Sequence, residues 1–352
     1  MFTKINIDGI IVQCSNIEKD RLMIFSNNPE KKPLTILLTV MLILNIIVSI
    51  NLSLANDLLF FLLFAMVGIA VSSLILTLSN PLLVLSSFFI GALISVIIEP
   101  SALTVIRSLT PLPFAFAINE VLKSKLVRSV AISISSAIVT VSFCVYFAFY
   151  TYNLQGAVTP NAIIDSFPAF FDELTEIICS STTITVAGET VPSISPEGAE
   201  KYLVALIGVI PGVMFFIFSI IGYLGAWLYK KGVKLTTGLN VAIQSWKLSV
   251  AFPTAVTFIL ALIVSSLSSS VSAFSLAAAN ICVVLYPTLF MAGLNSAFEP
   301  KIVGGYKFPR LLRPAVLIIV LLYDVTLFFL ICAFYALFDS IKGVIKKRKS
   351  DK

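Results

Sequence analysis

Long apolar runs follow one another through most of the 352-residue chain and leave it few choices of fold. A helix that crosses a bilayer needs about 20 consecutive, mostly apolar residues. Runs near that length, built mainly from Leu, Ile, Val, Phe and Ala, occupy 34–55, 58–78, 81–98, 101–121, 128–150, 202–229, 248–268, 272–297 and 314–340. The predicted fold is therefore all-α, a polytopic transmembrane helical bundle with about eight or nine membrane segments.

The composition agrees with this interpretation, because 58% of the residues are hydrophobic and only 12% are charged. A soluble domain carries about 25% charged residues. The lipid bilayer is thus the expected main partner, and the composition excludes a soluble enzyme, a secreted disulfide scaffold and a nucleic-acid-binding domain. The net charge of +6 comes largely from basic residues at the ends of the runs, where they orient the chain and contact anionic lipid.

Several kinds of chemistry have no sequence support. The chain has no histidine, and its five cysteines are widely spaced with no C-x-x-C pair, at Cys14, Cys144, Cys179, Cys282 and Cys332. This excludes His-based triads and gives no metal-binding pattern. The Gly-x-x-x-x-Gly-Lys-[Ser/Thr] phosphate loop is also absent. We therefore expect a protein that is not an enzyme and has no cofactor. Any ATPase would be a separate module.

An acidic segment at 151–200 interrupts the apolar runs. It carries seven acidic residues and no lysine or arginine. Basic loops stay on the cytoplasmic side, so this segment is predicted to face outward. Within it, the amphipathic pattern at 161–179 predicts a helix on the outer membrane surface, and 180–198 is predicted to be an irregular loop.

These features divide one predicted domain into five parts. They are a polar N-terminal segment (1–33), an N-terminal transmembrane bundle (34–150), an acidic extracytoplasmic loop (151–200), a C-terminal transmembrane bundle (201–340) and a basic tail (341–352). Four lysines between 230 and 247 place that loop inside. The basic residues at 301–313 and those of the tail cannot both be inside if 314–340 crosses once, so the side of the C-terminus stays open.

Ionisable residues at membrane depth are costly and therefore mark candidate sites. The segment 99–120 contains Glu99, Arg107, Pro111-Leu112-Pro113, Asn119 and Glu120. Prolines two apart interrupt a helix and free backbone carbonyls. Broken helices at membrane depth can line a binding cavity, so one hypothesis is a site for a small polar molecule. The alternative is a structural kink, with Arg107 at the interface or paired with Glu99.

Asp324 is a second candidate, near the middle of 314–340. Tyr323-Asp324 matches half of an intramembrane aspartyl protease site, but the Gly-x-Gly-Asp half is absent, and that chemistry needs two carboxylates. Asp324 would instead bond to a polar group on another helix, such as Asn280, or couple a proton to transport.

Two further patterns concern packing. Small residues four apart let helices approach closely, and they occur at Ala131/Ser135, Gly222/Ala226 and Gly293/Ala297. Aromatic residues flank the 230–247 lysines and are predicted to form an interfacial belt, at Tyr223, Trp227, Tyr229 and Trp246.

The chain also resembles the YybS-like predicted membrane proteins of Gram-positive bacteria, a family of unknown function. The resemblance lies in IPGVMFFIFSIIGYLGAWLYKKG (210–232), Trp246-Lys247-Leu248, Pro253, AANICVVLYPTLFMAGLNSAF (278–298), LFDSIKGVIKKRK (337–349) and LTPLPFAFAINE (109–120). That family is similar in build to the membrane-embedded substrate-binding subunits of energy-coupling vitamin transporters. The Ala-x-x-x-Ala motif with which those subunits dock their ATPase is missing from 34–55.

The resemblance implies a small-molecule carrier or a membrane-embedded substrate-binding subunit in the bacterial cytoplasmic membrane. On that hypothesis Glu99, Arg107, Asn119, Glu120 and Asp324 bind the ligand. The alternative is a non-enzymatic membrane scaffold of an envelope or cell-shape complex, with envelope proteins as partners. A stoichiometric small molecule or a stoichiometric protein after purification would distinguish the two.

Overall fold

The computed structural model describes residues 32–55, 57–123, 126–181, 183–186, 189–192, 196–237, 250, 252–267, 273–298, 302–303 and 306–307. Near the C-terminus it also describes 319–320, 323, 327–328, 331–338 and 340. Several predicted features lie outside these residues, among them Asp324, Trp246, most of the N-terminal segment and the basic tail.

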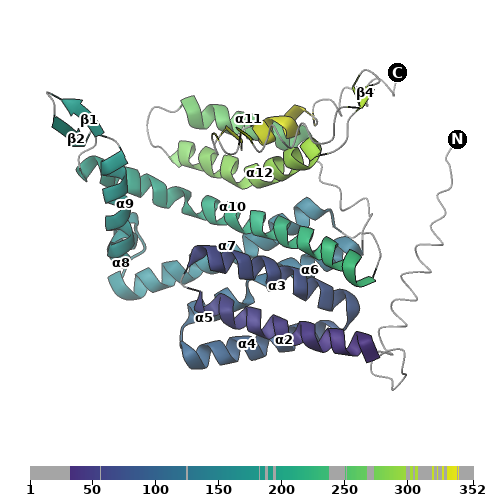
Figure 1. The fold of residues 1–352 in the computed structure, drawn as a ribbon. Coiled ribbons are helices and arrows are strands. Elements are labelled where there is room, and N and C mark those ends of the chain that lie inside the picture. Colours follow the sequence, from purple (N-terminus) through teal and green to yellow (C-terminus); the bar gives the residue numbers. More distant parts are fainter. Residues whose placement is uncertain are drawn as a thin grey trace. The chain divides into compact units, whose positions relative to one another are not determined.

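Helices dominate the described chain (Figure 1). They are α2 (Lys32–Leu54), α3 (Leu58–Leu78), α4 (Pro81–Ile98), α5 (Ala102–Leu109), α6 (Pro111–Leu122), α7 (Arg128–Gln155), α8 (Pro160–Ser166), α9 (Pro168–Ser181), α10 (Pro196–Thr237), α11 (Phe252–Leu267) and α12 (Ala273–Phe298). The strands form two short antiparallel hairpins, β1 (Thr183–Val186) with β2 (Glu189–Pro192) and β3 (Ile302–Val303) with β4 (Tyr306–Lys307).

Seven helical segments in the described residues are long and apolar enough to cross a membrane. α5 and α6 together count as one of them, and the apolar part of α11 is shorter, at Phe252–Ser265. The chain is therefore a multi-pass helical membrane protein, as predicted. The count of eight or nine segments stays a prediction, because much of 314–340 lies outside the described residues.

Two details of the acidic segment differ from the expectation. The amphipathic stretch forms two helices, α8 and α9, because Pro168 disfavours helical geometry at Phe167 and starts the second helix at its own position. The irregular loop expected at 180–198 is wrong for 183–186 and 189–192, which form strands β1 and β2. It is also wrong at its two ends, where α9 continues to Ser181 and α10 begins at Pro196. The β-branched residues of Thr183-Ile184-Thr185-Val186 favour strands.

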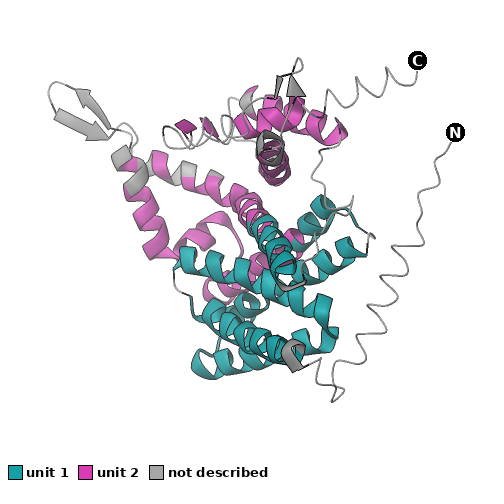
Figure 2. Ribbon diagram, turned by 45° about the vertical axis from the view of Figure 1, so that its right-hand side comes forward, with its two compact units in different colours: residues 1–135, 221–246 teal, residues 136–220, 247–352 magenta. Residues whose placement is uncertain are grey.

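The chain divides into two compact units (Figure 2). Unit 1 consists of residues 1–135 and 221–246, and unit 2 of 136–220 and 247–352. The acidic segment belongs to unit 2. α7 and α10 each contribute to both units, so the division falls inside helices.

Unit 1 contains α2 to α6 and the adjoining ends of α7 and α10. Its turns are short, and side chains cap the helices that follow them: Asp57 accepts from the Leu59 N–H, Asn80 from Leu82, and Ser101 from Leu103. Such caps satisfy N–H groups at the start of a helix that otherwise have no partner. Short capped turns make successive helices antiparallel, so α2 and α4 run parallel to each other.

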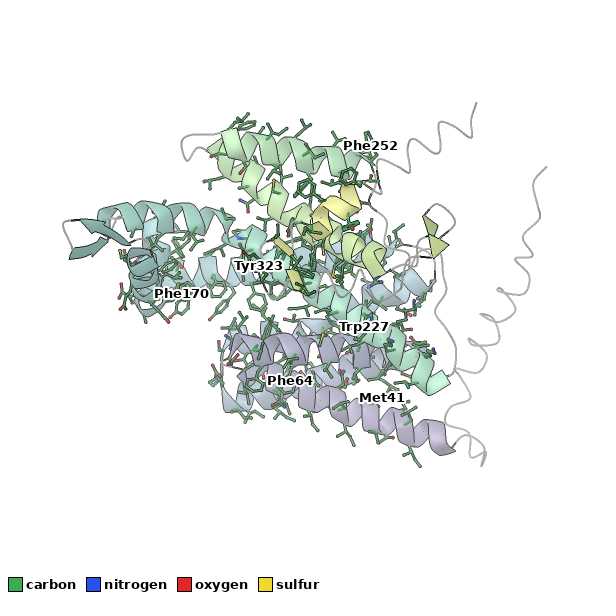
Figure 3. All side chains as sticks on the ribbon, turned by 45° about the horizontal axis from the view of Figure 1, so that its top comes forward. Met41, Phe64, Phe170, Trp227, Phe252 and Tyr323 are labelled. Atoms are coloured by element: carbon green, nitrogen blue, oxygen red, sulfur yellow. The ribbon has the colours of Figure 1, made fainter. Side chains whose placement is uncertain are left out.

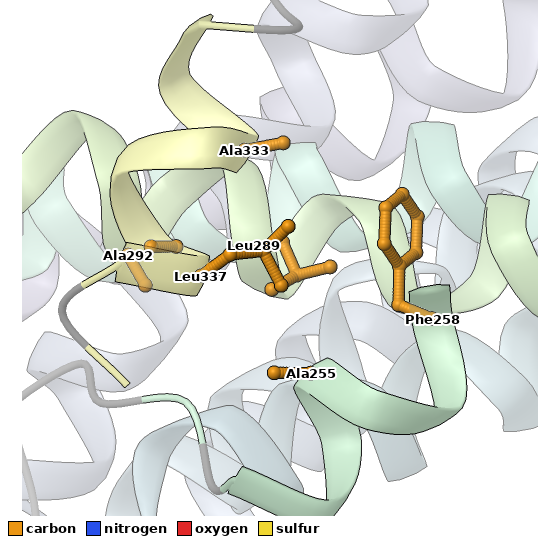
Figure 4. Close-up of a cluster of buried hydrophobic side chains, with 7 residues drawn as sticks. Ala255, Phe258, Leu289, Ala292, Ala333 and Leu337 are labelled. Atoms are coloured by element: carbon orange, nitrogen blue, oxygen red, sulfur yellow. The ribbon is translucent and has the colours of Figure 1, made fainter. Parts of the chain in front are cut away.

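Unit 2 contains two apolar clusters. In one, α8 and α9 pack on α10 through Phe171, Leu203 and Ile207. In the other, α11, α12 and the helical residues 331–338 meet around Phe258, Leu289 and Leu337, with small alanines between them (Figure 4).

Large apolar side chains also cover outward surfaces. Ile97 is 81% exposed and Trp227 is 51% exposed; Trp227 is labelled in Figure 3. In a soluble protein such a surface would drive aggregation, whereas in a membrane protein lipid covers it.

Candidate functional site

The segment 99–120 is interrupted where the sequence predicts, and protein groups satisfy the break. α5 ends at Leu109, and Pro111 is the first residue of α6, where a missing N–H costs nothing. The Thr110 hydroxyl donates to the Ile106 carbonyl at 3.0 Å, and the Ser135 hydroxyl donates to the Pro113 carbonyl at 3.0 Å. These contacts are those of a structural kink.

The charged residues of this segment lie at its two ends. Half-buried Arg107 donates from Nη1 to the Ala55 carbonyl at 3.4 Å, just beyond the C-terminus of α2. A cation is favoured there, because carbonyl groups point outward from that end of a helix. Glu99 follows α4, is exposed, and forms no ion pair with Arg107.

Asn119 and Glu120 lie in the last turns of α6, toward the other end. Asn119 is buried, whereas Glu120 forms a partly exposed ion pair with Lys123 at 2.9 Å. The structure therefore does not bring Glu99, Arg107, Asn119 and Glu120 together. Asp324 lies outside the described residues. A ligand-binding role for these five residues stays a prediction.

The groove that touches this segment is apolar. It has a volume of about 640 Å³ and lies between α4 and α5–α6, lined by side chains such as Phe89, Leu93, Val105 and Leu109. Neither Glu99 nor Arg107 lines it. Phe89 is 65% exposed, so this groove opens on the outer surface of unit 1 and suits lipid more than a polar molecule.

Sequence reasoning missed a buried polar seam between α2, α3 and α4. Asn45 donates from Nδ2 to the Ser87 hydroxyl at 2.8 Å and accepts from the Ser72 hydroxyl at 3.0 Å. One and two turns further, Ser49 contacts Gly91 and Ser53 bonds to Ser95. The signal was the placement of small or polar residues at every fourth position in both 34–55 and 81–98.

The close approach at this seam depends on Gly91. A Cβ atom at that position would lie 2.6 Å from Cβ and Oγ of Ser49. The pairs Asn45–Ser87 and Ser53–Ser95 are both separated by 42 residues in the sequence. This constant separation is what parallel helices produce. Unit 1 is thus held by interhelical hydrogen bonds and small residues, the usual means of helix association in lipid.

The predicted small-residue contact at Gly222/Ala226 is confirmed in unit 1. A Cβ on Gly222 would lie 2.6 Å from the Phe114 ring, and Ala226 is fully buried. The aromatic belt is partly wrong. Tyr223 and Tyr229 are buried: Arg128 lies 5.6 Å from the Tyr223 ring, and Tyr229 shares a hydrogen bond with Thr77 at 2.9 Å. Their polar partners inside the bundle, Arg128 and Thr77, replace the interfacial contacts that the prediction assumed.

A second cavity large enough for a small molecule lies in unit 2. It has a volume of about 570 Å³ and is bordered by α7, α8, α9, α10 and the loop between α7 and α8. Its lining contains no charged residue and is Cys144, Phe147, Ala148, Val158, Ile163, Phe167, Phe170, Phe171, Ile207, Ile210, Pro211 and Met214. We call this cavity the unit 2 pocket.

Aromatic side chains build one side of the unit 2 pocket. The Phe167 ring lies edge-on to Phe147 at 5.7 Å and stacks on Tyr150 at 5.3 Å. Phe167 sits at the break between α8 and α9, so the proline that divides those helices also turns this ring toward α7. Aromatic contacts of this kind stabilise a fixed wall.

A helix with an internal proline builds another side. Pro211 lies inside α10 and supplies no N–H for the carbonyl of Ile207. Asn280 of α12 supports the same turn, since its Nδ2 donates to the Gly208 carbonyl at 2.8 Å and to the Leu276 carbonyl at 3.0 Å. Gly212 leaves space for it, because a Cβ there would lie 2.6 Å from Asn280 Oδ1.

These bonds constrain the partner predicted for Asp324. Both amide hydrogens of Asn280 are donated to carbonyls. Only its oxygen could accept a further bond, so a carboxyl bonded to Asn280 would have to be protonated.

No metal centre is evident in the described residues, where no three His, Cys, Asp or Glu side chains gather. No protein-family model, curated protein or solved structure matches the chain. Its class, a multi-pass membrane protein, therefore rests on its helices.

Proposed function

We propose that this protein is a membrane-embedded binding protein or carrier for an apolar or amphiphilic small molecule, which occupies the unit 2 pocket. One observation carries the proposal: a cavity of about 570 Å³ whose lining has no charged side chain. Ligand pockets commonly measure about 300–1,000 Å³ and are mostly apolar.

The position of the pocket supports the same function. α7 and α10 contain segments long enough to cross a membrane, whereas α8 and α9 do not. A pocket between spanning helices and short amphipathic helices is accessible to molecules that partition into the bilayer. This ligand differs from the small polar molecule expected at 99–120, where the adjoining groove is apolar and the charged residues lie apart.

The test is purification of the full chain in detergent, followed by mass spectrometry of bound small molecules. Ala148 lines the pocket, so Ala148→Trp should fill it and remove the co-purifying molecule. Ala137 is exposed on the same helix, so Ala137→Trp is the matched control and should keep the molecule.

A bound molecule that is retained equally in both variants would contradict the proposal. A stoichiometric protein partner without a small molecule would favour the scaffold of an envelope complex.

A further inference from the structure

We infer that the ligand of the unit 2 pocket is a lipophilic organic cation, an ammonium or phosphonium group carried on an apolar body. This inference rests on the proposed function and names its ligand class. Three features carry it: the charge of the surrounding segment, the aromatic lining and the exposure of one lining ring.

The segments that form the pocket are mostly acidic, and Lys201 on α10 is the basic residue that follows Glu200. The chain carries seven acidic residues and no lysine or arginine between 129 and 200, the stretch that supplies most of α7 and all of α8 and α9. Asp165 on α8 and Asp172, Glu173 and Glu176 on α9 are exposed. Such a surface concentrates cations and repels anions.

The acidic and lining residues belong to the same short helices. Asp172 and Glu173 directly follow the lining residues Phe170 and Phe171. At physiological salt, charges interact over about 8 Å, which is more than one helical turn. A cation at the mouth of the pocket therefore experiences these carboxylates, whereas an anionic lipid headgroup would be repelled.

The lining suits the apolar body of such a ligand and its charge. Four phenylalanines line the pocket: Phe147, Phe167, Phe170 and Phe171. Aromatic faces attract organic cations without requiring a carboxylate in contact. Phe171 is 3% exposed and Phe170 is 55% exposed. The body would thus lie against Phe171, and the charge near Phe170, where it keeps part of its hydration.

The test compares ligands of similar shape and different charge. Equilibrium dialysis with the full-length protein in non-ionic detergent would use tetraphenylphosphonium as the cation, triphenylphosphine oxide as the neutral compound and tetraphenylborate as the anion. We expect saturable binding of the cation, at least about tenfold tighter than the neutral compound, and no saturable binding of the anion. The preference should shrink as salt is raised.

Variants separate the contribution of the exposed acids from that of the Phe170 ring. Replacing the four exposed acids together (Asp165→Asn, Asp172→Asn, Glu173→Gln, Glu176→Gln) should weaken cation binding about tenfold and leave the neutral compound unchanged. Asp57→Asn removes an exposed acid of unit 1 and should change the binding of neither compound. Phe170→Leu keeps the apolar lining and should weaken only the cation.

The outcomes distinguish the two proposals. Equal binding of the cation and the neutral compound, both lost in Ala148→Trp, would overturn the inferred ligand class and keep the pocket as a binding site. Binding of neither compound, or binding that Ala148→Trp leaves unchanged, would overturn the proposed function itself.

Discussion

The α2–α4 seam of unit 1 and the unit 2 pocket differ in how closely their helices approach each other. At the seam, Ser and Gly side chains let two helices approach until Asn45 and Ser87 bond directly. At the pocket, Phe147 and Phe167 contact each other, Pro211 removes a hydrogen-bond donor from α10, and a cavity remains between the helices. Small polar residues produce a rigid support, and bulky apolar residues with a proline produce a space that a ligand can fill.

The largest expected effect is a difference in chemical labelling between the acidic segment (151–200) and the lysines near the end of α10. In a variant without native cysteines, Glu189→Cys should react with an impermeant maleimide in intact cells and Lys234→Cys should not. This expectation follows from the positive-inside rule, which predicts that the acidic segment is outside and the lysines at the end of α10 are inside. Labelling of Lys234→Cys alone would reverse the orientation of the chain.

Overpacking the seam should be the most destabilising point change. Gly91→Val places methyl groups against Ser49, which already lies 2.6 Å from the position of an added Cβ. We expect a loss of about 1–3 kcal/mol, measured as a lower apparent Tm in detergent by size-exclusion chromatography. Ser86→Val, at an exposed position on the same helix, is the control. Equal effects of the two changes would mean that the seam is not tightly packed.

Removing the hydrogen bonds of the seam should cost less. Asn45→Ala loses the bonds to Ser87 and Ser72, and interhelical hydrogen bonds in membranes contribute about 0.6 kcal/mol on average. The expected loss is about 1 kcal/mol. A double-mutant cycle with Ser87→Ala measures the coupling between the two side chains. Additive effects would show that their bond contributes nothing.

The corresponding change in unit 2 should affect the pocket more than stability. Asn280→Asp leaves at most one donor, that of the protonated acid, for the Gly208 and Leu276 carbonyls. We expect a loss of at least about 1 kcal/mol together with weaker ligand binding, because α10 forms a wall of the pocket. Thr257→Val on α11 is exposed and should leave binding unchanged. Unaltered ligand binding in Asn280→Asp would show that the pocket does not depend on the bond between Asn280 and α10.

Arg107 should give the smallest effect. Its 3.4 Å bond to the Ala55 carbonyl is long and half-exposed, so Arg107→Gln should cost below about 1 kcal/mol. The thermal assay used for Gly91→Val measures it. Complete loss of ligand binding in this variant would restore the polar site predicted at 99–120.

Much of the local structure of unit 1 follows from the sequence. The apolar runs at 58–78 and 81–98 coincide with α3 and α4, and the break before Pro111 lies where two prolines require it. These features depend on nearest neighbours along the chain, so composition and spacing suffice. The β1–β2 hairpin was missed because the β-branched residues of β1 are flanked by Ser, Gly and Pro, which are typical of loops.

The candidate site is a different matter. Charge at membrane depth pointed to Glu99 and Arg107 as site residues. In the structure Glu99 caps the C-terminus of α4, and Arg107 bonds to a carbonyl just beyond the C-terminus of α2. The unit 2 pocket contains residues, such as Phe147 and Phe171, that look in the sequence like ordinary lipid-facing or core positions. Periodicity on one helix does not identify the helix that faces it.

The sequence by itself determined the solvent of this protein, because 58% hydrophobic residues arranged in long runs can be accommodated only in a bilayer. It also determined where α3 and α4 start and stop, since caps and prolines act locally. Only the tertiary structure decided that Asn45 meets Ser87, that Tyr223 is buried with Arg128, and that four helices leave a cavity. Those outcomes depend on how side chains from distant segments fill shared space, which no single segment specifies.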